Sequence, residues 1–245
     1  MSEFYQSIAK HYDDIFPLSD TLKRFLRSSL GIRKEDHILD AGCATGEVAL
    51  YLAQHARTVT GFDLDPDLVE IALIKQGKVG LENVRFLTSD MNDLDSMFTA
   101  GQFRIVLCLG NTLVHLPSTD AINDFFRKVA GILTDGGFFI FQILNYEKIL
   151  DQKTGELPLI DNKKITFERR YNHEMHKPRL AFNTRLTVKA TSETIDNSID
   201  LYPLQRGEIM GMSSKQLYRS VQFLGGFDGS VFSEEDDLLI GVWQK

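Results

Sequence analysis

The sequence predicts an α/β protein in which a doubly wound, mostly parallel sheet carries an antiparallel β insertion as a cap. Between residues 37 and 144, short apolar runs alternate with amphipathic helical segments, as in parallel strands joined by crossover helices. Beyond Asn145, single apolar and polar residues alternate instead, which is typical of antiparallel strands exposed on one face. A last apolar run, LLIGVWQK, returns the chain to the pattern of the sheet.

Two helices are predicted ahead of the sheet, at residues 4–16 and 19–30. Ser19 is a candidate N-cap of the second helix, and Gly31 is a candidate stop at its end. The apolar residues with helical spacing are Phe4, Ile8 and Tyr12 in the first helix and Leu22, Phe25, Leu26 and Leu30 in the second.

The remaining elements follow in chain order. Core strands are predicted at HILDA, TVTGF, VRFLTS, FRIVLCLG and FFIFQIL, with helices through VALYLAQH, DLVEIALIKQ and AINDFFRKVAGIL. The insertion is expected to form antiparallel strands within residues 164–202. A helix through residues 215–226, a solvated acidic turn at residues 233–237 and a closing strand with Trp243 in the core complete the prediction.

Composition limits the partners of the chain. Its 245 residues carry a formal net charge of -7, which disfavours nucleic acid and anionic membranes because both bind clustered positive charge. The two cysteines, Cys43 and Cys108, match no metal-ligand spacing, so we expect no metal and a reduced, cytoplasmic setting. The chain shows no basic leader and no apolar run of the roughly 18 residues that span a bilayer.

The strongest motif is ILDAGCATGEVALYLA, in which a strand ends at Asp40 and runs through a turn into a helix. Small residues at Gly42, Ala44 and Gly46 let a ligand approach the main chain, and the helix N-terminus presents unpaired N–H groups. A purely structural glycine turn is the competing interpretation. The turn lacks the GxGxxG spacing of dinucleotide-binding proteins.

Acidic residues close the next two strands. Asp63 ends the second strand, where a carboxylate in an open α/β fold can accept both hydroxyls of a ribose. The alternative is an acid that stabilises the next helix N-terminus, a role that Asp65 or Asp67 could fill instead. Asp90 and Met91 follow the third strand, where an acid and an apolar side chain could bind and cover an adenine ring.

These motifs resemble those of the class I S-adenosylmethionine-dependent methyltransferases over about residues 35–145 and the closing strands. The family motif DxGxGxG is matched except that Ala44 replaces the middle glycine, a small intrusion. The resemblance implies a seven-stranded Rossmann-like sheet and S-adenosyl-L-methionine as cofactor. We then expect lead-in helices at 1–34, the cofactor-binding core at 35–145, the β cap at 146–204, and a C-terminal helix with closing strands at 205–245.

The resemblance also implies roles for individual residues. The glycine loop with Gly42 passes the methionine portion, Asp63 holds the ribose, and Asp90 with Met91 holds the adenine. Asp40 either orients the loop or reaches the methionine ammonium. The expected cofactor-binding residues are Asp40, Gly42, Cys43, Gly46, Asp63, Leu64, Asp90, Met91 and Leu109.

A second stretch resembles the glycine N-methyltransferases and related small-amine methyltransferases. Their GNS-x-x-HL motif is matched by Gly110, Asn111, Thr112, His115 and Leu116, and their Asn-Tyr pair by Asn145 and Tyr146. Leu144 stands where the group has an arginine, and leucine cannot pair with a substrate carboxylate. Glycine is therefore disfavoured as substrate unless an arginine of the insertion or its flank replaces the charge; the candidates are Arg169, Arg170, Arg185 and Arg206.

The candidate catalytic residues are Asn111, His115 and Tyr12. Asn111 lies at the carboxyl end of the fourth strand and either orients the acceptor or caps the following turn. His115 is a base by type, although its apolar turn favours a structural role. Tyr12, with Tyr5 and Tyr202, either lines an acceptor pocket or packs the lead-in helix and the cap.

Together these features predict a methyltransferase that moves a methyl group by in-line displacement to nitrogen or oxygen of a small-molecule acceptor. Methylation of a protein or tRNA, and a non-catalytic cofactor-binding module, are the alternatives. The sequence does not indicate an oligomeric state.

Overall fold

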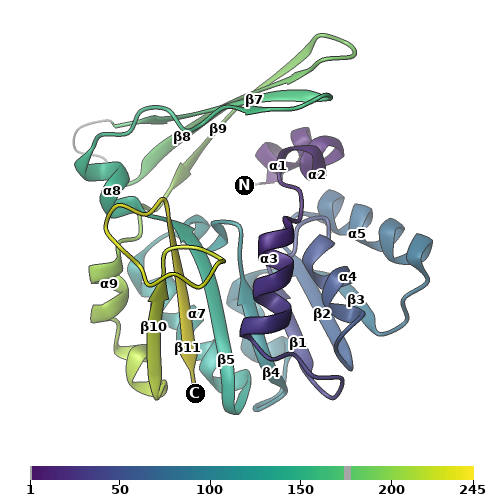
Figure 1. Ribbon diagram of the computed structural model, residues 1–245, viewed down its shortest axis with the longest axis vertical. Coiled ribbons are helices and arrows are strands. Elements are labelled where there is room, and N and C mark those ends of the chain that lie inside the picture. Colours follow the sequence, from purple (N-terminus) through teal and green to yellow (C-terminus); the bar gives the residue numbers. More distant parts are fainter. Residues whose placement is uncertain (1, 174–177) are drawn as a thin grey trace.

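The computed structural model describes residues 2–173 and 178–245, which form a seven-stranded sheet and a separate four-stranded sheet. The four-stranded sheet lies across the top of the molecule, and the first helices of the chain lie beneath it (Figure 1). This is the predicted architecture: a mostly parallel α/β core with an antiparallel β insertion as cap.

The strand order of the large sheet is β10-β11-β5-β4-β1-β2-β3. Strands β1 to β5 are parallel, and β11 pairs antiparallel with both β5 and β10. Chain order reverses between β1 and β4, which is where open α/β sheets bind ligands at their carboxyl ends. The strands are β1 (His37–Ala41), β2 (Thr58–Asp63), β3 (Val84–Thr88), β4 (Phe103–Cys108), β5 (Leu133–Leu144), β10 (Ser220–Leu224) and β11 (Leu238–Gln244).

Helices cover both faces of this sheet because its strands are apolar on both sides. Ile38 packs with α4 and α5 on one face, whereas its neighbour Leu39 packs with α6 and α7 on the other. Trp243 is fully buried in the second of these layers, as predicted. The helices are α4 (Glu47–Ala53), α5 (Pro66–Val79), α6 (Leu94–Met97) and α7 (Thr119–Ile132), and the short 3-10 turns are η3 (Met91–Asp93) and η4 (Thr112–His115).

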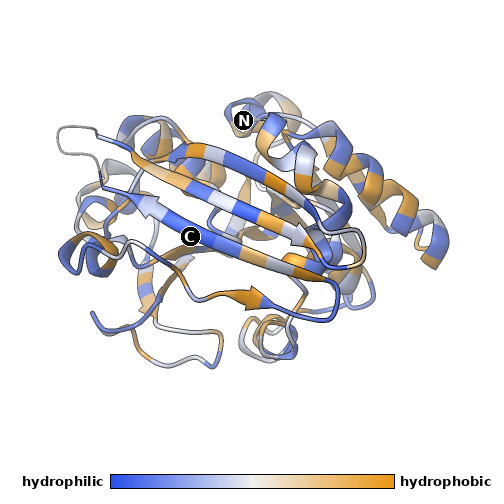
Figure 2. Cartoon of the chain, turned by 90° about the horizontal axis from the view of Figure 1, so that it is seen from above, coloured by the Kyte–Doolittle hydropathy of each residue, from blue (hydrophilic) through white to orange (hydrophobic). Residues whose placement is uncertain are grey.

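The cap is an antiparallel sheet in the order β6-β7-β8-β9, reached from β5 through the helix α8 (Tyr146–Asp151). Its strands lie side by side across the rest of the molecule when seen from above (Figure 2). They are β6 (Ile160–Asp161), β7 (Ile165–Asn172), β8 (Leu180–Val188) and β9 (Glu193–Leu201). The single-residue alternation of the sequence therefore predicted the insertion correctly.

The lead-in segment is more broken than the two helices that its apolar spacing predicts. It forms α1 (Ser2–Ile8), η1 (Ala9–His11), α2 (Tyr12–Ile15), α3 (Asp20–Arg24) and the π-helical turn η2 (Phe25–Ser29). Phe4, Ile8 and Ile15 pack against Phe167 of the cap and its neighbours. Ser19 caps α3 as predicted, since its hydroxyl accepts the backbone N–H of Leu22 at 3.1 Å.

The prediction of a helix at residues 215–226 is wrong. This stretch forms the 3-10 turn η5 (Ser213–Leu217) and the strand β10, and the C-terminal helix lies earlier, at α9 (Arg206–Gly211). Without β10, β11 would be the edge strand of the sheet, with unpaired backbone N–H and C=O groups. Strand β10 pairs with these groups, and its Val221 packs against the buried layer around Trp243. The acidic run 233–237 is a turn between β10 and β11, as predicted. Within the described ranges, no helix is both long and apolar enough to cross a membrane.

Candidate active site

A cavity of about 330 Å³ opens at the carboxyl ends of β1 to β4, at the point where chain order reverses. Seven of the residues predicted for the site line it: Tyr12, Gly42, Asp63, Leu64, Asp90, Met91 and His115. The other five are not among its lining residues: Asp40, Cys43, Gly46, Leu109 and Asn111. The motifs thus converge on one place, although not every side chain of a motif reaches it.

The glycine turn has the backbone that its small residues suggested. Gly42 and Gly46 adopt left-handed φ values of +75° and +80°, and Ala44 adopts +47° despite its Cβ. A Cβ on Gly42 would collide with Thr112, and one on Gly46 would lie 2.6 Å from Phe86. Gly42 therefore permits the close approach of Thr112 at the cavity wall, whereas Gly46 serves the packing of the turn against β3.

Asp63 joins the turn to the second strand. Its Oδ2 accepts the backbone N–H of Ala44 at 2.8 Å, and its Oδ1 accepts that of Asp65 at 3.0 Å. Burial raises the pKa of the Asp63 carboxyl, and these backbone hydrogen bonds act in the opposite direction. The helix N-terminus is capped by Asp65, which accepts from Asp67 and Leu68. Asp63 is therefore free of the capping role and faces the cavity.

Asp40 lies buried below the turn with only 3% of its surface exposed. Burial, and then the nearby charge of Asp63, raise the pKa of Asp40 to about 7. Its Oδ2 is sealed from solvent and has no hydrogen-bond partner among the described residues. A buried carboxyl oxygen of this kind, beside the Gly42 turn, fits the ammonium end of an amino-acid ligand.

The far side of the cavity pairs an acid with apolar side chains. Asp90 accepts the N–H of Asn92 at 2.8 Å and so caps η3, which carries Met91 into the cavity wall. Leu64 also lines this wall. One carboxylate beside two flexible apolar side chains fits a flat heteroaromatic ring with an exocyclic amine, as in adenine.

Two tyrosines of the lead-in segment and one histidine form the roof of the cavity. The hydroxyl of Tyr5 lies 2.9 Å from Nε2 of His115, and Tyr12 packs beside Tyr5 with ring centroids 6.4 Å apart. Burial, then the positive charges of Arg179 and the N-terminus, lower the pKa of His115 to about 4. His115 is thus a neutral imidazole near pH 7, and it faces the cavity rather than serving only the fold.

Both polar atoms of the Asn111 side chain bond other protein groups. Its Nδ2 donates to the hydroxyl of Tyr146 at 2.9 Å, and its Oδ1 accepts the backbone N–H of Leu144 at 3.0 Å. It makes no side-chain capping bond to the following turn, so the capping interpretation is wrong. Asn111 instead holds together the carboxyl ends of β4 and β5 and orients Tyr146, which lies 3.4 Å from the hydroxyl of Tyr171 in the cap.

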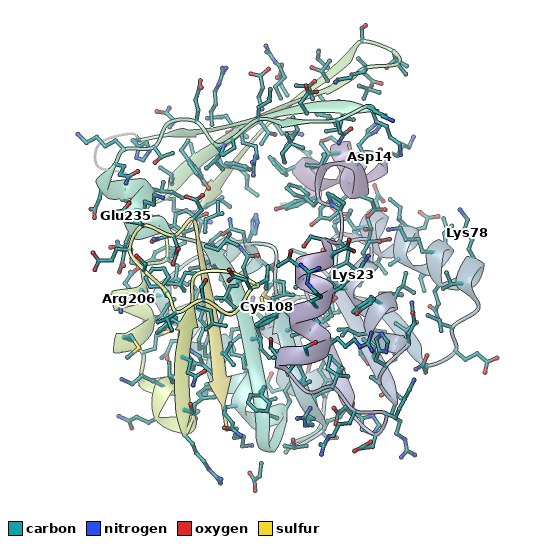
Figure 3. The ribbon with its side chains drawn as sticks, viewed as in Figure 1. Asp14, Lys23, Lys78, Cys108, Arg206 and Glu235 are labelled. Carbon is teal, nitrogen blue, oxygen red and sulfur yellow. The ribbon has the colours of Figure 1, made fainter. Side chains whose placement is uncertain are left out.

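The remaining candidates lie apart from the cavity. Cys43 and Cys108 are buried, burial raises the pKa of both thiols, and Cys108 lies in the interior of the sheet (Figure 3). Tyr202 is not a lining residue, because its hydroxyl bonds Thr119 at 2.6 Å and Glu208 at 2.5 Å. No group of three acidic, histidine or cysteine side chains arranged to hold a metal occurs in the described part of the chain.

Some residues that line the cavity were not among the predicted site residues. Thr112 and Leu116 belong to the Gly-Asn-Thr stretch that pointed to this place, so their motif signalled them. Leu68 had no such signal, because it is an ordinary apolar position of α5 that becomes a wall only when the lead-in segment packs over it.

Comparisons with known proteins agree with this geometry. Residues 38–137 match the family described as methyltransferase domain. The chain is 28% identical to YqeM of Bacillus subtilis (strain 168), which is named as a methyltransferase, over 60% of this chain and 58% of that protein. It is 26% identical to glycine N-methyltransferase of Rattus norvegicus, over 74% of this chain and 62% of that enzyme. The chain thus spans less than two thirds of the length of either relative.

A solved structure shows the same fold over nearly the whole chain. The S-adenosylmethionine-dependent methyltransferase from Clostridium acetobutylicum ATCC 824 superposes with a TM-score of 0.79 and covers 98% of both chains at 17% identity. The family match lies on the strands and turns that build the cavity, and the described acids and glycine turn fit the cofactor of that family. Residues 38–137 therefore form a methyltransferase domain, and the chain has the fold of the S-adenosylmethionine-dependent methyltransferases.

Proposed function

We propose that this protein transfers a methyl group from S-adenosylmethionine to a nitrogen or oxygen of a small-molecule acceptor. The observation that carries the proposal is the cavity at the switch point of the sheet, with acids on its walls and a roof of tyrosine and histidine. The bound cofactor would supply a methyl group on a sulfonium. The acceptor would form a bond to the methyl carbon in line as the carbon–sulfur bond breaks, with S-adenosylhomocysteine as the leaving group.

Each part of the cofactor is assigned to residues whose surroundings suit it. Asp63 accepts the ribose hydroxyls, and Asp90 with Met91 and Leu64 holds the adenine. Asp40 does not line the cavity, but its buried Oδ2, which has no partner among the described residues, suits the methionine ammonium. Gly42 and Cys43 form the backbone beside the methionine portion, and their N–H groups are already bonded to Phe62 at 2.8 and 2.9 Å, which keeps the turn rigid.

The roof excludes water from the reacting atoms and sets the acceptor chemistry. Tyr5 and Tyr12 are half-buried, the burial of their hydroxyls raises the pKa of both, and both therefore remain neutral donors near pH 7. His115 is a weak base because its pKa is about 4. A neutral amine, which attacks without prior loss of a proton, suits this roof better than a hydroxyl, which benefits from a strong base.

A small acceptor suits the site better than a macromolecule. The cavity walls carry Asp63, Asp65 and Asp90, and the negative charge of these acids repels a nucleic-acid backbone. The cap and the lead-in segment cover the acceptor side. Phe4, Ile8 and Ile15 of the lead-in segment fill the space between that segment and the cap sheet. No described feature favours the macromolecular or non-catalytic alternative over this proposal.

The test has a binding arm and a turnover arm. Isothermal titration with S-adenosylhomocysteine should show binding in the low micromolar range, and Asp63→Ala should abolish it. The control is Asp67→Ala, which removes a nearby acid in the first turn of α5 that does not line the cavity. Release of S-adenosylhomocysteine is then measured over a panel of amines, hydroxylated metabolites and sugars. No cofactor binding at millimolar ligand, or full binding by Asp63→Ala, would contradict the proposal.

A further inference from the structure

The inner face of the cap sheet is apolar except for one cross-strand row. In the register of the sheet, Arg169 of β7 pairs with Thr184 of β8, which pairs with Asn197 of β9. Apolar rows flank this polar row on both sides: Phe167, Leu186 and Ile195 on one side, and Tyr171, Phe182 and Ile199 on the other. Polar groups in such a place need partners or a ligand.

Two members of the row have hydrogen-bonding atoms without a partner. Thr184 is 5% exposed, and its Oγ1 is sealed from solvent with no hydrogen bond among the described residues. The same holds for Nε of Arg169, whose Nη2 donates to the carbonyl of Pro158 at 2.8 Å. Asn197 differs, because it donates to Ser7 at 2.7 Å and so fastens the lead-in segment.

Arg169 also lacks a countercharge within the described residues. The outer-face arginines are paired: Arg170 with Glu168 at 3.0 Å and Arg185 with Asp196 at 2.7 Å. Burial lowers the pKa of the Arg169 guanidinium, which reflects its loss of water. Tyr171 does not neutralise it, because burial, and then Tyr146, raise the pKa of that hydroxyl far above its ordinary value.

The row adjoins the acceptor side of the candidate active site. Tyr171, the next inner-face residue of β7 after Arg169, reaches the hydroxyl of Tyr146 at 3.4 Å, and Tyr146 is held by Asn111 at the end of β4. No cap residue is among those that line the cavity with Asp63 and Asp90, so the cation of Arg169 lies outside that lining, next to Tyr171 on the cap side. The opposite charges of Arg169 and these acids would orient a molecule with a negative group toward the cap.

We propose that the methyl acceptor carries an oxyanion, a carboxylate or a phosphate-type group, that binds Arg169 and Thr184 on the inner face of the cap. This inference rests on the proposed function and names the acceptor class of that same site. A guanidinium fork and a hydroxyl are suitable donors to such a group. Because the two atoms are sealed, binding requires the Arg169 side chain to turn inward, which breaks its single bond to Pro158.

The experiment titrates the S-adenosylhomocysteine-loaded protein with propanoate, ethylphosphonate and the neutral analogue propanamide, and measures the melting temperature. We expect saturable stabilisation by at least one anion and none by propanamide. Arg169→Met should weaken that anion's binding by about tenfold or more, as for loss of a charge-assisted hydrogen bond. Thr184→Val should weaken it less, and the control Arg185→Met on the outer face should leave it unchanged.

The outcomes separate this inference from the proposed function. Stabilisation by only one anion identifies the oxyanion as carboxylate or phosphate-type. The absence of saturable stabilisation by either anion, or equal stabilisation of Arg169→Met, would overturn the inference. Repeating the titration without S-adenosylhomocysteine, together with the cofactor titration above, shows whether a failure belongs to the anion site or to cofactor binding.

Discussion

Individual residues in and around the glycine turn have different roles, although they belong to the same set of motifs. Gly42 permits the close approach of Thr112 beside the cavity, whereas Gly46 permits the contact with Phe86. Asp63 orients the turn from the cavity side, whereas Asp40 is buried with a carboxyl oxygen that has no partner among the described residues. Residue substitutions can separate these functions.

Asp40 should make the stability of the cofactor-free protein depend on pH. Its folded pKa of about 7 lies above the ordinary 3.8, so its carboxyl stabilises the fold fully below about pH 4. That stabilisation is lost as the pH rises through about 7. Asp40→Asn should therefore show a smaller fall in melting temperature from pH 4 to pH 8 than the parent, measured by calorimetry. Superimposable profiles would contradict the buried-acid assignment.

Gly46→Ala should destabilise the protein more than Gly80→Ala. Both glycines have positive φ, +80° and +66°, so alanine is strained by about 1–2 kcal/mol at either position. Only Gly46 adds a steric clash, because its Cβ would meet Phe86 at 2.6 Å while Gly80 faces open space. We expect at least about 1 kcal/mol of further loss at Gly46 in urea unfolding. Equal losses would refute the packing role.

At the scale of elements, the lead-in segment connects the two sheets and covers the cofactor cavity. Below it, Asp13 accepts the Thr45 hydroxyl of the glycine turn at 2.5 Å and pairs with Lys75 of α5. Above it, Asp14 pairs with Lys164 at the cap, 2.7 Å away (Figure 3). Because Tyr5 and Tyr12 roof the cavity, ligand exchange requires this segment to move.

Asp13→Asn should therefore accelerate the release of S-adenosylhomocysteine. Loss of the charged contacts to Thr45 and Lys75 favours the open segment, and we expect dissociation to become about 5–10-fold faster. Stopped-flow displacement measures the rate. The control is Asp20→Asn, which removes an exposed pair with Lys23 on α3 and should leave the rate unchanged. An unchanged rate in Asp13→Asn would show that the segment does not limit exchange.

At the scale of the whole molecule, packing of the lead-in segment between both sheets predicts that they unfold together. Phe4, Ile8 and Ile15 share a buried cluster with Ile165 and Phe167 of the cap. S-adenosylhomocysteine at 100 times its Kd should add about 2.7 kcal/mol, which raises the melting temperature by roughly 5–10 °C. Calorimetry should show one transition that shifts as a whole. A separate, unshifted transition of the cap would contradict this coupling.

Most of the fold could be predicted from local pattern. The strands that alternate with helices are apolar on both faces, as Ile38 and Leu39 are, and the cap strands alternate residue by residue. The failure at residues 215–226 has a definite cause. The apolar spacing there suits a helix, but pairing with the free edge of β11 was available only after the sheet had formed.

The sequence by itself determined the parallel core, the antiparallel cap and a glycine turn with acids at the ends of successive strands. These features depend on residues close in the chain, whose spacing sets backbone conformation and burial. Only the tertiary structure decided that Tyr5 bonds His115 and that Asn111 serves Tyr146. It also decided that Arg169 has no countercharge among the described residues while Arg170 and Arg185 do. Those facts depend on which distant elements pack together, because a side chain's partners and its access to water are set by that packing.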